Sequence, residues 1–293
     1  MRLFLLTGAA MLAFAANSLL NRAALAENAI DPHNFTLMRL GSGAITLMLI
    51  ALIVNRKSMR DIAAAGTWPS AIALFVYALG FSIAYLWLGA GMGALILFAM
   101  VQFTMLGTAI AKGDRPSALE LVGLVIALVG FVALVSPGFE QAPDLQAVGL
   151  MACAGVAWGI YSLWGRGSKH PTLDTAGNFW RAFLIGSVVI VPIITLQLSP
   201  ALVSLKGMAL AVASGALASG VGYAIWYTAL PGLTRTRAGI VQLSVPALAA
   251  IAGVLFLGEP LTLKFGLLSV MILAGVGLAT LAKPKANAQS TGK

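Results

Sequence analysis

Ten long apolar stretches separated by short connections constrain this chain more than any other feature. They cover residues 3–20, 35–54, 68–88, 91–111, 118–135, 147–164, 179–198, 205–229, 238–257 and 261–282. A helix of roughly 20 apolar residues spans a bilayer core of about 30 Å. The stretches are continuously apolar and lack the alternation of a membrane β-barrel. They predict an all-α integral membrane protein of about ten transmembrane helices.

Composition excludes a water-soluble fold. The 293 residues are 60% hydrophobic and 9% charged, whereas soluble domains carry about 25% charged residues. A net charge of +9 would favour a nucleic-acid partner in a soluble protein. Here the basic residues lie in short connections, where orientation in a membrane explains them. The expected partners are therefore a lipid bilayer and a small-molecule substrate, without nucleic acid.

Charges in the connections also predict an orientation. Counted alternately from the N-terminus, one set of connections holds Arg2, Arg56, Lys57, Arg60, Lys112, Arg115, Arg166, Lys169, Arg235, Arg237, Lys283, Lys285 and Lys293. The other set holds Arg22, Lys206 and Lys264 together with Glu27, Asp31, Glu140, Asp144 and Glu259. The positive-inside rule places the first set in the cytoplasm. We therefore expect a multi-pass protein of the inner (plasma) membrane with both termini cytoplasmic.

The two halves of the chain resemble each other. Residues 13–22 align with 157–166, and Asn34-Phe35 followed by Arg39 aligns with Asn178-Phe179 followed by Arg181. Tyr85 corresponds to Tyr223, and residues 112–116 correspond to 256–260. Because each half has five spans, the second half enters the membrane from the opposite side, which is the inverted repeat of alternating-access transporters. The expected units are residues 1–139, residues 146–282 and a cytoplasmic tail, 283–293; paired repeats can form a site within a monomer.

Specific landmarks extend this comparison. Each repeat carries an Arg in its second span and closes with an apolar segment, at 123–134 and 266–281, and the fourth span of the second repeat ends in Leu-Gly-Glu-Pro-Leu, residues 257–261. With these features the chain, from residue 3 to 282, resembles EamA domains of the drug/metabolite transporter superfamily. The first repeat departs from the motif with Gly113-Asp114-Arg115-Pro116.

The resemblance implies a function in transport. Within the superfamily the chain is most similar to YddG-type exporters of aromatic and other neutral amino acids. Export of drugs or of other metabolites, such as nucleotide sugars, is the alternative, although a nucleotide sugar needs basic residues converging on its phosphates. A membrane enzyme is the remote alternative, because the sequence has no cluster of acids, His or a nucleophile with its base. No cofactor or metal ion is expected.

Polar residues inside apolar spans are candidates for a substrate cavity, because polar groups in a bilayer are costly. Gln242, Ser244 and Pro246 lie near the middle of the ninth span, and Gln102 lies in the equivalent part of the fourth. Pro246 cannot donate to the carbonyl near residue 242, which favours a locally unwound helix. The competing interpretation is that both Gln side chains only bridge helices.

Aromatic side chains form a second group of candidates. Tyr77, Phe81 and Tyr85 recur on one helical face, and the others are Trp158, Tyr161 and Tyr223, with Asn17 on the helix equivalent to that of Trp158. Such faces stack on apolar side chains and attract an ammonium group. Aromatic belts at the membrane interface are the rival explanation, which fails for Tyr77 because it lies close to mid-span.

Arg39 and Arg181 lie a turn or two inside their spans. They could bind a substrate carboxylate, or snorkel and tie their helices to carbonyls near the interface. Symmetric placement puts them near opposite membrane faces, which favours the structural role. Because no Asp or Glu lies near the middle of a span, coupling through a buried acid is not expected, and a facilitator is.

Overall fold

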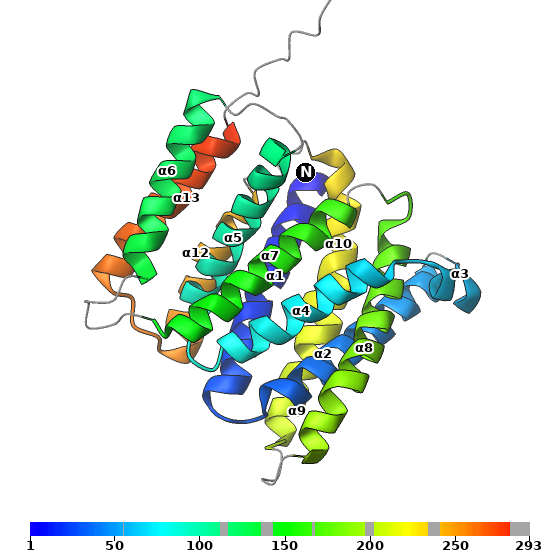
Figure 1. Ribbon diagram of the computed structural model, residues 1–293. Helices are drawn as coiled ribbons and strands as arrows, with labels where there is room; N and C mark the ends of the chain where they lie inside the picture. The colour runs from blue at the N-terminus through cyan, green and yellow to red at the C-terminus, as the bar shows by residue number, and fades with distance from the viewer. Residues whose placement is uncertain are drawn as a thin grey trace, which may run out of the picture.

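The computed structural model describes residues 1–54, 56–111, 117–135, 143–165, 168–196, 202–233 and 241–281. Within these ranges the chain is helical, apart from connections and an isolated antiparallel bridge between Ile30 and Val203. The helices are α1 (Arg2–Ala26), α2 (Pro32–Leu49), α3 (Met59–Ala64), α4 (Trp68–Ala84), α5 (Ala90–Ala111), α6 (Ala118–Val135), α7 (Leu145–Gly165), α8 (Pro171–Leu196), α9 (Leu205–Ala213), α10 (Gly222–Ala229), α12 (Ser244–Leu257) and α13 (Leu263–Leu281). Two π-helices, η1 (Ile50–Val54) and η2 (Ser214–Val221), and the 3-10 turn η3 (Leu230–Gly232) continue them (Figure 1).

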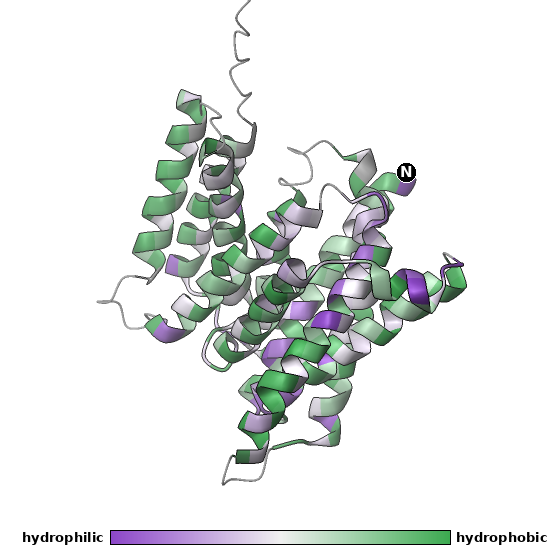
Figure 2. Ribbon diagram, turned by 45° about the vertical axis from the view of Figure 1, so that its right-hand side comes forward, coloured by the Kyte–Doolittle hydropathy of each residue, from purple (hydrophilic) through white to green (hydrophobic). Residues whose placement is uncertain are grey.

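Six helical segments are long and apolar enough to cross a membrane: Arg2–Ala26, Pro32–Val54, Ala90–Thr108, Leu145–Gly165, Pro171–Leu196 and Leu205–Ala229. Four shorter apolar helices cover Trp68–Ala84, Leu121–Leu134, Ser244–Leu257 and Leu263–Ala279. Large apolar side chains face outward along them; Val188 is 75% exposed and Val270 67% exposed. Figure 2 shows that hydrophobic residues predominate along the helices. Contiguous exposed apolar surface of this kind is suited to lipid, so the all-helical membrane fold is confirmed.

Helices of the two halves pack against one another. Helix α2 packs on α8, α5 on α12 and α6 on α13, while α1 contacts η2, α10 and α12, and α7 contacts α4 and α5. In Figure 1 the α6–α13 pair stands beside the remaining helices. The two halves therefore share one helical core rather than forming two separate bundles.

Connections meet at two opposite ends of the bundle. At one end, Ile30 pairs with Val203, Glu27 with Lys206 and Arg22 with Glu259; we call this the acidic end. At the other, Gly66 N–H donates to Asp174 at 3.1 Å and Thr67 N–H to Asn178 at 2.8 Å; we call this the basic end, because α1 begins there at Arg2 and the connection after η1 carries Arg56 and Arg60.

Local side chains determine where several helices begin. Asp31 accepts from the N–H groups of His33 and Asn34 and so caps α2, with Pro32 at its first position. Ser58 and Asp61 form a capping box at the start of α3, and Thr67 caps α4. These side chains satisfy N–H groups that have no partner within the helix.

Glycines permit the close approach of helices in the core. A Cβ placed on Gly43 of α2 would lie 2.7 Å from the ring of Phe179 and 3.1 Å from the carbonyl of Gly215. A Cβ on Gly275 of α13 would lie 2.7 Å from the carbonyl of Gly123 on α6. Small residues at such contacts let helix backbones pack closely in membranes.

Candidate functional site

Polar side chains from α1, α2, α4 and η2 meet at the centre of the bundle. Arg39 Nη2 donates to the hydroxyl of Tyr77 at 2.8 Å, and Arg39 Nε donates to Ser219 at 3.3 Å. Asn17 Nδ2 donates to the same Tyr77 hydroxyl at 3.3 Å. We call Asn17, Asn21, Arg39, Tyr77, Ser214 and Ser219 the central polar cluster. The Tyr77 hydroxyl links Arg39 to the Asn17 side of this cluster.

The second half of this cluster joins α1 to η2. Ser214 Oγ donates to Asn17 Oδ1 at 2.6 Å, and Asn21 Nδ2 donates to Ser214 Oγ at 3.3 Å and to the Asn17 carbonyl at 2.8 Å. Ser82 Oγ of α4 donates to Asn21 Oδ1 at 3.3 Å. All four side chains are buried, so these bonds satisfy groups that would otherwise be costly in an apolar bundle.

A π-helix brings the two serines of η2 to this cluster. Ser214 and Ser219 are five residues apart, which is the hydrogen-bond repeat of a π-helix and not of an α-helix. Ser214 therefore contacts Asn17 of α1 while Ser219 contacts Arg39 of α2. Short π segments inside helices are frequent at functional sites.

Aromatic rings enclose a small cavity beside the polar cluster. The cavity has a volume of about 20 Å³ and is lined by Phe14, Asn17, Ser18, Tyr77, Phe81, Leu97, Phe98, Trp158 and Tyr223. The ring of Trp158 lies 4.9 Å from that of Tyr77, 5.0 Å from Tyr223 and 6.3 Å from Phe14. A space of this size holds about one water molecule, so in this conformation the centre of the bundle is closed. We call it the central cavity.

A larger cavity lies next to it on the basic end. Its volume is about 300 Å³, and its lining includes Thr67, Tyr161, Asp174, Asn178 and Tyr227. Tyr161 stacks on Trp158 with ring centroids 5.5 Å apart. Because Tyr161 lines this basic-end cavity and Trp158 lines the central cavity, the stacked pair separates the two.

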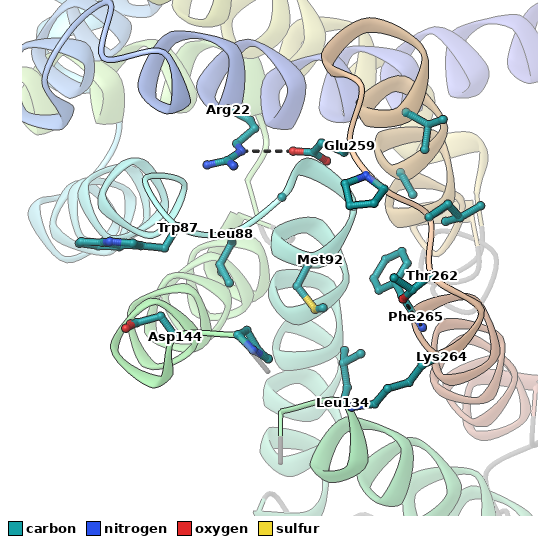
Figure 3. Close-up of a pocket in the computed structure, with 17 residues that line it drawn as sticks. Arg22, Trp87, Leu88, Met92, Leu134, Asp144, Glu259, Thr262, Lys264 and Phe265 are labelled. Carbon is teal, nitrogen blue, oxygen red and sulfur yellow. Dashed lines mark hydrogen bonds and ion pairs between the residues drawn. The ribbon is translucent and has the colours of Figure 1, made fainter. Parts of the chain in front are cut away.

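The acidic end holds a third cavity, of about 770 Å³, between α5, α12 and the α6–α13 pair (Figure 3). Arg22 and Glu259 lie on one side of it, and Leu134 and Lys264 lie on the other. Its apolar lining includes Met92 of α5. Met92 precedes the central-cavity residue Leu97 by five positions, which is about 7.5 Å along the helix.

The Leu-Gly-Glu-Pro-Leu motif explains how this end is held together. Gly258 adopts φ +64° and ends α12 in the left-handed conformation that glycine favours. Glu259 then accepts from Ala90 N–H at 3.0 and 2.8 Å, which caps α5. Arg22 Nε binds Glu259 at 3.2 Å, and its Nη1 donates to the carbonyls of Tyr85 and Leu86. The Arg22–Glu259 pair therefore connects the ends of α1, α4, α5 and α12.

Five of the predicted candidates line the central cavity: Asn17, Tyr77, Phe81, Trp158 and Tyr223. Tyr161 does not line this cavity but stacks on Trp158, which does. Tyr85 does not line the cavity, because it lies at the end of α4 and its hydroxyl donates to the Ala90 carbonyl at 3.3 Å. Gln102 is also absent from the lining; its Nε2 is buried without a hydrogen-bond partner.

The candidates of the ninth span lie elsewhere. Val241 and Gln242 are helical, the chain turns at Leu243, and α12 begins at Ser244, so Ser244 and Pro246 lie in the first turn of α12 and Gln242 precedes it. The turn agrees with Pro246, which cannot donate to the Gln242 carbonyl. Ser244 is exposed and its hydroxyl donates to the Val241 carbonyl at 2.7 Å. Gln242 and Pro246 are buried but do not line the central cavity.

The structure separates the two arginines that the repeat aligns. Arg181 donates to the carbonyls of Ala63, Ala65 and Gly177, and so ties α8 to the α3–α4 connection. These contacts are those of the structural interpretation, in which the side chain ties its helix to backbone carbonyls. Arg39 differs: its side chain is 1% exposed, and its hydrogen bonds go to Tyr77 and Ser219 in the core instead of carbonyls.

Sequence reasoning missed several members of the cluster. Ser214 and Ser219 were not among the predicted candidates, and no sequence signal marks the π-helix that orients them. Asn21 had a detectable signal, since an Asn in an apolar span four residues after Asn17 shares its helical face. Among the residues that the structure describes, no group of three or more His, Cys, Asp or Glu side chains could hold a metal ion.

Comparisons with known proteins agree with this architecture. The model of the EamA-like transporter family matches residues 145–281. An uncharacterised protein of Pseudomonas aeruginosa is 46% identical over 278 residues, which cover 94% of each chain. The threonine/homoserine exporter RhtA of Escherichia coli is 32% identical over 183 residues, 60% of each chain. A crystal structure that is 18% identical superposes with a TM-score of 0.67 over 95% of this chain and 97% of its own, and shares the fold.

Apolar helices with outer faces suited to lipid, packed around a polar centre, are the features of a multi-pass membrane protein. Through residues 145–281 the chain is similar to EamA-like transporters.

Proposed function

We propose that this protein exports neutral amino acids, aromatic ones among them, by alternating access around the central cavity. The observation that carries the proposal is the central polar cluster, whose hydrogen-bonding groups lie against the rings of Tyr77, Trp158 and Tyr223. Polar groups suit the backbone part of an amino acid, and aromatic faces suit an ammonium group and an apolar side chain. The similarity to an exporter of threonine and homoserine supports the same substrate class.

The proposed topology has ten crossing helices in two inverted repeats, residues 1–139 and 146–282, followed by the tail 283–293. Support comes from the pairing of equivalent helices, because α2 packs on α8, α5 on α12 and α6 on α13, as a two-fold axis in the membrane plane requires. We place the basic end and both termini in the cytoplasm of the inner membrane, following the charge distribution. The repeats meet within one chain, so the proposed unit is a monomer.

In this scheme the conformation described here is closed on both sides of the central cavity. The Trp158–Tyr161 stack separates that cavity from the basic end, and Arg22 with Glu259 joins four helix ends at the acidic end. The side chains of the central polar cluster are neutral or basic, so the cluster offers no carboxyl group to carry a coupling proton. We therefore propose that substrate moves down its own gradient.

Uptake of labelled amino acids into proteoliposomes tests the proposal. Threonine, homoserine, methionine, phenylalanine and tryptophan form the panel, with empty liposomes as the background. Tyr77→Phe removes the hydroxyl that joins Asn17 and Arg39 and should lower flux about tenfold. Tyr85→Phe is the matched control, since its hydroxyl donates to a backbone carbonyl outside the cavity.

Transport of another metabolite class with no flux of any amino acid on this panel would refute the substrate assignment. A pH gradient across the liposome membrane tests whether transport is coupled to protons. Accumulation of substrate above its external concentration, driven by that gradient, would contradict movement down the gradient.

A further inference from the structure

Arg39 is the largest side chain fully buried in the described part of the chain. Its guanidinium lies 5.0 Å from the ring centroid of Tyr77 and 5.1 Å from that of Phe81. Nε and Nη2 donate to the hydroxyls of Ser219 and Tyr77, but Nη1 is buried without a hydrogen-bond partner. Among the ion pairs of the described residues, none includes Arg39.

Charge makes this arrangement unusual. A guanidinium remains protonated in proteins, and a buried charge is costly unless an opposite charge or several hydrogen bonds compensate it. The other arginines of the helical core are compensated: Arg22 binds Glu259 and two carbonyls, and Arg181 binds three carbonyls. Arg39 has two neutral hydroxyls and two rings, so it retains positive charge and an unused donor for an anion.

Tyr77 connects this donor to the central cavity. Its ring lines the cavity together with Phe81, while its hydroxyl accepts from Arg39 Nη2. An anion that entered the cavity and displaced this hydroxyl would meet both Nη2 and the unpartnered Nη1. Two parallel N–H donors are the geometry with which arginine binds a carboxylate.

We propose that Arg39 is the carboxylate-binding residue of the transport site. The inference rests on the proposed function, since an amino acid is the substrate that brings both a carboxylate and an ammonium group. The carboxylate binds Nη1 and Nη2, and Tyr77 moves from Arg39 to admit it. The ammonium group then faces the rings of Trp158 and Tyr223, which line the same cavity. Amines and amides, which lack the carboxylate, bind poorly because they leave the buried guanidinium uncompensated.

Ligand pairs that differ only in the carboxylate provide the test. Binding of L-threonine and L-threoninamide, and of L-phenylalanine and L-phenylalaninamide, is measured by calorimetry on the full chain in nanodiscs. The native protein should prefer each acid over its amide by about 10- to 100-fold, the value of a charged hydrogen-bonded pair. Arg39→Gln should lose that preference, and Arg39→Lys should keep part of it, because lysine retains the charge without the paired donors.

Arg181→Gln is the matched control. It removes the repeat-equivalent arginine, whose donors are used by backbone carbonyls, so the acid-to-amide ratio of the native protein should persist. The ratio is measured within each variant and does not depend on how much protein folds. If Arg39→Gln cannot be purified, the ratios of the native protein and of Arg39→Lys still test the proposal.

The outcomes separate this inference from the proposed function. Amino acids and their amides bound equally by the native protein would overturn the role of Arg39 while leaving amino-acid transport standing. Equal discrimination by native protein and Arg39→Gln would do the same. Arg39-dependent binding of propionate or phenylacetate, without binding of any amino acid, would support the carboxylate site and refute the amino-acid substrate. If binding depends on chloride and does not distinguish acids from amides, the Arg39 guanidinium binds an inorganic anion, and the inference is overturned.

Discussion

Arg22 and Glu259 lie 237 positions apart in the chain and form an ion pair with 3.2 Å between Nε and Oε1. The pair joins the end of α1 to the residue after α12. The remaining bonds of the two side chains reach α4 and α5. This ion pair connects several helix ends at the acidic end of the bundle, so its removal should destabilise the packing of more than one helix.

Glu259→Gln should lower the melting temperature of the detergent-solubilised protein. The variant leaves Arg22, whose side chain is 20% exposed, without its counter-charge, at a cost of about 1–3 kcal/mol. Thermal unfolding followed by tryptophan fluorescence measures the change. Lys206→Ala is the control, because it breaks an ion pair at the same end whose side chains are 60% and 54% exposed, and exposed pairs contribute at most about 1 kcal/mol. Equal shifts in the two variants would contradict the role of the Arg22–Glu259 pair.

Ser214→Ala should reduce transport. The change removes the 2.6 Å bond to Asn17 and leaves a buried amide oxygen with a weaker set of partners, which should lower the rate of uptake about tenfold. Thr228→Val serves as the comparison on α10, since its exposed hydroxyl bonds only to the carbonyl of Ala224 in the same helix. Initial rates in proteoliposomes distinguish them, and unchanged uptake by Ser214→Ala would remove η2 from the proposed site.

Trp158→Ala should impair both substrate affinity and stability. The indole contacts the rings of Tyr77, Tyr161 and Tyr223, and its loss joins the central cavity to the basic-end cavity, with a destabilisation of about 3–5 kcal/mol. The apparent KM for uptake should rise and the melting temperature should fall. Trp180→Ala removes an indole that is 39% exposed on α8 and should change KM little. A KM that stays at the native value in Trp158→Ala would argue against an aromatic binding site.

Gly43→Ala should destabilise the α2–α8–η2 contact. The added methyl group would lie 2.7 Å from the Phe179 ring and 3.1 Å from the Gly215 carbonyl, closer than atoms can pack without displacement, and overpacking costs about 1–3 kcal/mol. Gly149→Ala adds the same group where nothing lies within 4 Å and should be neutral or stabilising, because alanine favours helix. Melting temperatures in one detergent decide between these outcomes.

Aromatic candidates come together in the structure where their spacing on a single helix places them on one face. Tyr77 and Phe81 are four residues apart, which places them on one helical face, and both line the central cavity. Tyr85 has the same spacing, but it follows the last residue of α4. There the helix ends, the periodicity no longer applies, and the hydroxyl reaches the Ala90 carbonyl instead.

Arg39 shows where position along a span misleads. Distance from the start of a hydrophobic stretch gives its place on α2, but not which helices surround it. Tyr77 of α4 and Ser219 of η2 surround its guanidinium, so it lies in the core instead of reaching carbonyls near the interface.

The sequence by itself determined a helical membrane protein, because apolar length and the separation of charge are local properties that a bilayer constrains directly. Only the tertiary structure decided which side chains meet. The π-helix η2 brings Ser214 to Asn17 and Ser219 to Arg39, and such a change in helical repeat depends on packing between helices. Whether the buried Arg39 guanidinium has a counter-charge likewise depends on its neighbours in the fold. The free-energy cost of a buried charge is determined by the groups within hydrogen-bonding distance.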